Sequence, residues 1–327
     1  MLRHEAILFV VLVLEWLFFN SVGARFGSLD NFFDLVRHSV EIGLLALALT
    51  PIILTGGIDL SVGSLLGLCA IVFGKLWRDG GLPIPAAAAC TLLVGALAGG
   101  LNASLITGLR LPSLIVTLGT FSLFRGLAEA LTRGMDTFTN FPAAFLELGQ
   151  ERWLGLPTQA WFFFAIAIGV WLLVHRTTFG RSFRAIGFAP EGARYAGLPV
   201  ERRLALVYVL AGAIVALAAI IYTGRLGQAK ADAGTGYELF AITAVVLGGT
   251  SIFGGTGSVT GTLLGVAAIA VLNNGLVHAR QPREVAGMLT GALLLAALSG
   301  GVFAKMISSR RARRQTVATD IQSTETT

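Results

Sequence analysis

The segment T-G-G-I-D-L-S-V-G-S at 55–64 places one carboxylate between two glycine breaks, with apolar runs on both sides. Glycine frees the backbone from a regular helix, so Asp59 can accept hydrogen bonds from the first N–H groups of a helix that follows. An ionisable residue within a membrane segment is also a candidate for a transport pathway. We therefore expect Asp59 to cap a helix, and we keep it as a pathway candidate.

A second glycine-rich segment, G-G-T-S-I-F-G-G-T-G-S at 248–258, superficially resembles a phosphate-binding loop. It has no Gly-Lys-Ser/Thr ending and follows no soluble strand, so it predicts a short re-entrant turn. The sequence S-V-G-S-L-L-G at 61–67 is echoed by S-V-T-G-T-L-L-G at 258–265, each after a glycine pair. The echo indicates either an internal transporter repeat or the recurrence of small residues in packed helices.

Amide and aromatic side chains within the apolar runs could bind a polyhydroxylated solute. Asn102, Asn273 and Asn274 each offer a donor and an acceptor, although such amides also join membrane helices. Phe121 could stack on a sugar or pack against a neighbouring helix. With Asp59, these four residues are the candidates for a translocation pathway.

Charged residues inside the predicted spans are few. Arg125 and Glu129 lie four positions apart, on one helical face, and we expect them to pair in the protein interior. A secondary transporter driven by an ion gradient would need titratable residues near the middle of the membrane, where only these two and Glu15 qualify. An ion-coupled secondary sugar transporter is thus the alternative to an ATP-driven importer.

The stretch 176–203 contains six arginines. Pro190 suits a first helical turn, Glu191 favours a helix N-terminus, and Gly197 with Pro199 would end the helix. These signals predict a short helix at about 190–196 that docks into a groove of a partner. The alternative is a positively charged loop that only fixes the topology.

Catalytic and metal-binding patterns are missing from the sequence. The four histidines show no H-E-x-x-H spacing, the two cysteines form no C-x-x-C, and there is no G-x-S-x-G elbow. We therefore predict no enzyme activity, no metal site and no cofactor bound by this chain.

The composition gives the class of protein that must position these residues. Of the 327 residues, 55% are hydrophobic and only 13% charged, which excludes a soluble domain. Continuous apolar runs predict an all-α polytopic membrane protein with about ten spans, and eight to ten as the range. The expected spans are 6–22, 38–55, 60–78, 84–107, 113–132, 159–175, 204–224, 238–252, 257–278 and 284–304. Those around 38–78 and 238–278 contain the glycine breaks and are the least regular.

The basic residues also predict an orientation. The arginine-rich stretch and the basic cluster from Lys305 to Arg314 both flank apolar runs, which is typical of cytoplasmic segments rather than of nucleic-acid binding. Four spans separate the two clusters and six precede the first, so both termini are expected in the cytoplasm of a bacterial inner-membrane protein. We expect a transmembrane permease domain at 1–307 and a disordered polar cytoplasmic tail at 308–327.

Several motifs together resemble the permease subunits of ribose-type ABC importers, a group that includes ribose, rhamnose and autoinducer-2 permeases. They are T-G-G-I-D-L-S-V-G-S at 55–64, I-V-T-L-G-T at 115–120, G-R-S-F-R-A-I-G at 180–187, A-G-T-G-Y-E-L at 233–239, A-V-V-L-G-G-T-S-I-F-G-G-T-G-S at 244–258 and L-N-N-G-L at 272–276. Features such as G-L-C-A-I at 67–71 look most like the autoinducer-2 permeases, whereas 233–239 looks more like ribose permeases. The resemblance therefore leaves the sugar open.

The resemblance implies a membrane subunit without an ATPase site of its own. Two identical or related permease chains would form one pathway, two ATPase subunits would bind ATP and Mg, and a periplasmic sugar-binding protein would dock on the other side. It also places the ATPase contact on the 180–197 loop. The residues expected there are Gly180, Arg181, Arg184, Ile186, Gly187, Pro190, Glu191, Ala193, Arg194 and Gly197.

Overall fold

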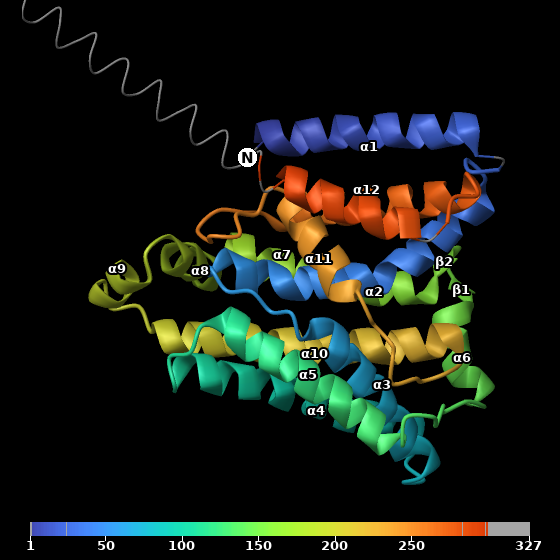
Figure 1. The fold of residues 1–327 in the computed structure, drawn as a ribbon, viewed down its shortest axis with the longest axis horizontal. Helices are drawn as coiled ribbons and strands as arrows, with labels where there is room; N and C mark the ends of the chain where they lie inside the picture. Colours follow the sequence, from blue (N-terminus) through green and yellow to red (C-terminus); the bar gives the residue numbers. More distant parts are fainter. Residues whose placement is uncertain (1, 24, 283, 298, 300–327) are drawn as a thin grey trace, which may run out of the picture.

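The computed structural model describes residues 2–23, 25–282, 284–297 and 299, which form a bundle of helices (Figure 1). The elements in chain order are α1 (Leu2–Val22), α2 (Leu29–Leu54), α3 (Val62–Arg78), α4 (Ile84–Thr107), α5 (Ser113–Leu131), α6 (Ala143–Gln150), β1 (Arg152–Trp153), β2 (Leu156–Pro157), α7 (Thr158–Arg176), α8 (Thr178–Phe188), α9 (Pro190–Tyr195), α10 (Val200–Leu226), α11 (Tyr237–Leu247) and α12 (Val259–His278). A further apolar helix covers Glu284–Ala297. The two short strands pair antiparallel, so the predicted all-α membrane fold is confirmed.

Seven of the described helices are long and apolar enough to cross a membrane. They are His4–Val22, Leu29–Leu54, Ile84–Thr107, Ser113–Leu131, Thr158–Arg176, Val200–Leu226 and Val259–His278. The other expected spans correspond to α3, α11 and Glu284–Ala297, which are shorter. Ten spans therefore remain a prediction, and the basic cluster at 305–314 and the tail at 308–327 lie outside the described residues.

Helices α2 and α10 form the centre of the bundle. In the most apolar window of α2, 72% of the residues are buried, against 11% for α1, which packs along α12 at the edge (Figure 1). Helix α10 packs against α4, α2 and α3. Large apolar side chains are exposed on α1, α4, α5 and α7, as expected for surfaces that face lipid or another membrane chain.

Glycines bring the backbones of α4 and α10 into contact. A Cβ atom on Gly99 would lie 2.1 Å from the carbonyl oxygen of Tyr208, and one on Gly212 would lie 2.0 Å from that of Gly95. Neither distance is sterically allowed, so each position requires glycine. Small residues at helix crossings are the usual means of close packing in membranes.

The glycine break after α2 is observed where the sequence predicts it. Gly56 has a φ of +83°, and α3 begins six residues further on, at Val62. The Asp59 carboxylate accepts hydrogen bonds from the backbone N–H and the hydroxyl of Ser61, at 2.8 and 2.6 Å. Asp59 thus helps to start α3, but it holds the capping residue Ser61 rather than the N–H groups of the first turn.

The second break repeats this arrangement. Helix α11 ends at Leu247, Gly249 has a φ of +87°, and Ser258 caps α12 by accepting a hydrogen bond of 2.9 Å from the Gly261 N–H. In both places a helix, a glycine turn, a serine and a new helix follow one another. This matches the sequence echo, with one difference: the serine before α3 makes no side-chain cap.

Candidate functional site

The arginine-rich loop folds into two helices at one end of the bundle, α8 and α9 (Figure 1). The helix predicted at 190–196 is observed at Pro190–Tyr195, with Pro190 in its first turn and Gly197 at φ +80° two residues after its end. Helix α8 was not predicted, although Phe179, Phe183 and Ile186 recur at the i, i+4, i+7 spacing of an amphipathic helix. Thr177 caps α8 by accepting a hydrogen bond from the Phe179 N–H.

Buried residues fix this loop to the bundle. Ile186, Ala193 and Val200 form a small apolar cluster that joins α8, α9 and α10. A Cβ atom on Gly180 would lie 1.8 Å from the carbonyl oxygen of Val174, so α8 packs directly against the end of α7. These apolar and close-packed contacts set the orientation of α9 relative to the membrane helices.

Charged residues complete the attachment. The Arg194 guanidinium contacts the carboxylates of Glu191 at 2.6 Å and Glu201 at 2.9 Å, tying α9 to the start of α10. The hydrogen bond that Arg194 donates to the Glu201 carboxylate, followed by the charge of Glu191, holds the pKa of Arg194 above its ordinary value. Arg184 donates to the Val174 carbonyl at 3.2 Å, while Arg181 is exposed.

Four glycines from three segments form a junction at the end of α8. A Cβ atom on Gly187 would lie 2.1 Å from the Leu54 carbonyl oxygen and 2.4 Å from the Gly255 nitrogen. A Cβ atom on Gly254 would lie 2.7 Å from the Gly56 nitrogen. The end of α8, the break after α2 and the turn at 248–258 therefore meet with their backbones in contact. The sequence predicts each of the three segments separately but not this junction.

Two aromatic side chains lie at the exposed surface of this loop. Phe188 is 85% exposed at the end of α8, and Tyr195 is 91% exposed at the end of α9. Neither was among the predicted contact residues. An aromatic residue in a polar loop was the available signal, since such residues are enriched where proteins bind partners.

The pathway candidates fall into three separate places. Asp59 and Asn102 are both buried, and Ser61 joins them, because Asn102 donates a hydrogen bond of 3.0 Å to the Ser61 hydroxyl. The Asn102 side-chain oxygen has no hydrogen-bond partner among the described residues. Phe121 lies half-buried on α5.

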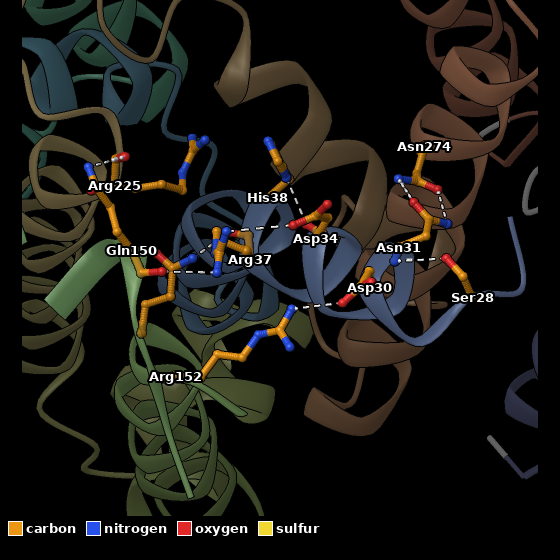
Figure 2. Close-up of polar contacts among 11 residues, drawn as sticks. Ser28, Asp30, Asn31, Asp34, Arg37, His38, Gln150, Arg152, Arg225 and Asn274 are labelled. Atoms are coloured by element: carbon orange, nitrogen blue, oxygen red, sulfur yellow. Dashed lines mark hydrogen bonds and ion pairs between the residues drawn. The ribbon is translucent and has the colours of Figure 1, made fainter. Parts of the chain in front are cut away.

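Asn273 and Asn274 lie on α12, away from this group. Asn274 and Asn31 exchange two hydrogen bonds, of 2.9 and 3.0 Å, that join α12 to α2 (Figure 2). Asn274 thus takes the helix-joining role that the sequence left as an alternative. Asn273 is half-buried beside it.

The predicted pairing of Arg125 with Glu129 is wrong. The Arg125 guanidinium instead donates to the carbonyl oxygens of Ala231 and, at 3.1 Å, Ala233, and Glu129 is exposed. The reason is that the segment before α11 is not helical, so its carbonyls lack helical donors. Sequence spacing within one helix gives no information about such an acceptor.

Two glycines of α3 make room for this segment. A Cβ atom on Gly63 would lie 2.6 Å from the Gly234 carbonyl oxygen, and one on Gly67 would lie 2.9 Å from that of Ala233. Glu238, at the start of α11, is buried against Gly63. Glu238 was not among the predicted functional residues, although a carboxylate at the start of an apolar run was the available signal.

No set of three histidine, cysteine or acidic side chains within the described residues could hold a metal ion. The structure has two features that could serve a function. One is the exposed surface of α8 and α9, and the end of α8 contacts the two glycine breaks. The other is the buried group formed by the Ser61 hydroxyl, the Asn102 amide and the Asp59 carboxylate. The first arrangement is suited to contact with another protein. The second is suited to hydrogen bonding within the membrane.

Comparison with known proteins shows the family. The family described as "Branched-chain amino acid transport system / permease component" matches residues 31–298. The autoinducer 2 import system permease protein LsrD of Escherichia coli K12 is 39% identical over 301 residues, covering 90% of this chain and 91% of that protein. LsrD of Shigella flexneri shows the same values, and that of Escherichia coli O157:H7 is 38% identical. No solved structure matches with significance. The chain belongs to this permease family and is similar to ribose-type ABC permeases, with autoinducer-2 import permeases among its relatives.

Proposed function

We propose that the chain is the membrane subunit of an ATP-driven importer for a monosaccharide or sugar-like signal of the autoinducer-2 class. The observation that supports this proposal is the glycine junction, where the end of α8 contacts the break after α2 and the turn at 248–258. A partner ATPase that moves α8 and α9 would act through Gly187 on the break after α2 and on the turn at 248–258. A change at one exposed loop would thus reach both broken segments of the membrane domain.

The partners in this proposal are those of an ABC importer. Two ATPase subunits bind ATP and Mg and contact α8 and α9 in the cytoplasm, where Phe188 and Tyr195 supply exposed aromatic surface. A second permease chain completes the pathway, and a sugar-binding protein docks at the periplasmic end near β1 and β2. Both termini lie in the cytoplasm, and the basic loop supports this orientation.

The solute pathway is proposed to pass the break after α2. Asp59, Ser61 and Asn102 supply carboxylate, hydroxyl and amide groups, the donors and acceptors that a polyhydroxylated solute requires. Phe121 and Asn273 are secondary candidates on α5 and α12.

The ATPase contact is tested by membrane retention of the importer's ATPase subunits. We expect Phe188→Ala combined with Tyr195→Ala to release the ATPase from membranes while the permease is still inserted. Trp153→Ala, an exposed aromatic at the other end of the bundle, is the matched control and should retain it. Full retention by the double variant would contradict the proposed docking surface.

The solute class is tested by uptake in the complete importer. Labelled autoinducer-2 or ribose should be taken up, whereas labelled leucine should not. Uptake of leucine alone would favour the amino-acid substrate named in the family description.

A further inference from the structure

An apolar pocket lies between α2, α4, α7 and α10, apart from the polar group at Asp59. Its volume is about 510 Å³, within the range of about 300–1,000 Å³ that is usual for small-ligand sites. Fourteen residues line it, among them Pro51, Leu92, Gly169, Leu173, Val207 and Leu210. All are apolar or glycine, so a polar ligand would lose its hydrogen bonds there and only hydrocarbon fits.

The pocket lies about midway along α10 and extends toward the basic end of the bundle along α2 and α7. Leu173 lies about one turn before the end of α7 at Arg176, and Pro51 lies about one turn before the end of α2. Exposed apolar side chains lie at the pocket, among them Leu210 of the lining on α10 and Ile168 beside the pocket on α7. The surface around the pocket is therefore apolar, as expected for a surface in contact with lipid.

A cation lies on the same helix face as the pocket. Arg203 precedes Val207 by four positions and Leu210 by seven on α10, so the three share one face. Its guanidinium carbon lies 3.9 Å above the centre of the Phe179 ring, and its Nε is buried with no hydrogen-bond partner among the described residues. A donor in this position lacks an anionic acceptor.

Four arginines at this end of the bundle form no ion pair with any described residue, while the nearby Glu191 and Glu201 both pair with Arg194. None of the ion pairs formed by the described residues includes Arg176, Arg181, Arg202 or Arg203. Arg176 lies at the end of α7, with its guanidinium carbon 5.1 Å from the centre of the Trp171 ring. Unpaired arginines at the membrane surface attract anionic headgroups.

We propose that the pocket holds an acyl chain of an anionic phospholipid whose phosphate is bound by Arg203. The hydrocarbon lining selects the chain, and the unpaired guanidinium selects the headgroup, because arginine forms strong hydrogen bonds to phosphate. This inference goes beyond the proposed function, since the site does not depend on which solute is carried or on what drives its transport.

The test uses phosphatidylglycerol and phosphatidylcholine that carry a photoreactive group in one acyl chain, each added to vesicles containing the full chain. Phosphatidylglycerol should label α7 and α10 peptides around Gly169 and Leu210 severalfold more than phosphatidylcholine. Arg203→Gln should remove that preference, and Arg203→Lys should restore most of it. Arg202→Gln, on a neighbouring exposed position, is the matched control and should keep the preference.

A second variant tests the pocket itself. A Cβ atom on Gly169 would meet open space, so Gly169→Leu fills the pocket without a clash and favours the helix. It should lower labelling by both lipids while the protein stays monodisperse. Equal labelling by the two lipids in the unmodified chain, or unchanged labelling in Gly169→Leu, would overturn the proposal. Disulfide-linked dimers of a Leu210→Cys variant would also overturn it, because a second copy would then cover this face.

Discussion

The Glu41 carboxylate of α2 and the Arg225 guanidinium of α10 form an ion pair with an N–O distance of 2.7 Å. The Glu41 side chain is fully buried and that of Arg225 is 9% exposed. The pair joins the two central helices at the end of the bundle opposite α8 and α9 (Figure 2 shows Arg225 beside Gln150). A buried pair of this kind costs desolvation to form but is also costly to break on one side only.

Removing one member of this pair should destabilise the protein. We expect Glu41→Gln to lower stability by about 3–5 kcal/mol, because it leaves the Arg225 charge buried without its partner. The measurement is thermal unfolding in detergent. Asp30→Asn removes the charge of the exposed contact with Arg152 and is the control, with an expected cost of about 0–1 kcal/mol. Equal effects of the two variants would contradict a buried role for the pair.

The contact between α4 and α10 gives a second prediction. Gly99→Ala should destabilise the protein by about 1–3 kcal/mol, because the added methyl group meets the Tyr208 carbonyl and the helices must separate. Gly119→Ala on α5 is the control, since nothing lies within 4 Å of its added Cβ. That control should be neutral or slightly stabilising by helix propensity. Comparable melting temperatures of the two variants would show that α4 and α10 are not packed in this way.

A substitution at the glycine junction should impair transport without impairing ATPase binding. Gly187→Ala places a methyl group against Leu54 and Gly255, so we expect the ATPase to remain bound while ATP-dependent uptake falls severalfold. Gly192→Ala on α9, whose Cβ would make an ordinary 3.4 Å contact, should support normal uptake. Unchanged uptake by Gly187→Ala would show that the junction does not transmit movement.

The segment before α11 should depend on Arg125. Arg125→Leu removes the donors to Ala231 and Ala233, so those carbonyls lose their partners and the segment should open. We would measure thiol labelling of an Ala231→Cys substitution from the aqueous phase. Labelling should become faster with Arg125→Leu and stay slow with Glu129→Gln, because Glu129 is exposed and makes no ion pair among the described residues.

Sequence patterns predicted helix positions well where the interactions between residues adjacent in the chain determine the structure. Pro190 and Gly197 delimit α9 because their backbone preferences act on adjacent residues. The apolar runs gave the long helices for the same reason. Asp59 was correctly placed at a helix start, although its partner is Ser61 within the same turn.

Contacts between distant segments were not predictable from one sequence. Arg125 bonds to carbonyls more than a hundred positions away, and Asn274 pairs with Asn31 at the far end of the chain. The sequence predicts a helix break at each of three glycines, Gly56, Gly187 and Gly254. It does not predict that these glycines contact one another, because that contact depends on how α2, α8 and the 248–258 turn pack. The pathway candidates were chosen by residue type, and packing distributes them over three places.

In the proposed function, ATP hydrolysis by partner subunits drives solute uptake through this chain. The most direct measurement is solute uptake by proteoliposomes that contain the permease, its ATPase and its binding protein, with ionophores collapsing every ion gradient. We expect uptake of the sugar-like solute to require ATP and to disappear with the Phe188→Ala, Tyr195→Ala double variant. Uptake without ATP that follows an imposed ion gradient would contradict it and favour a secondary transporter.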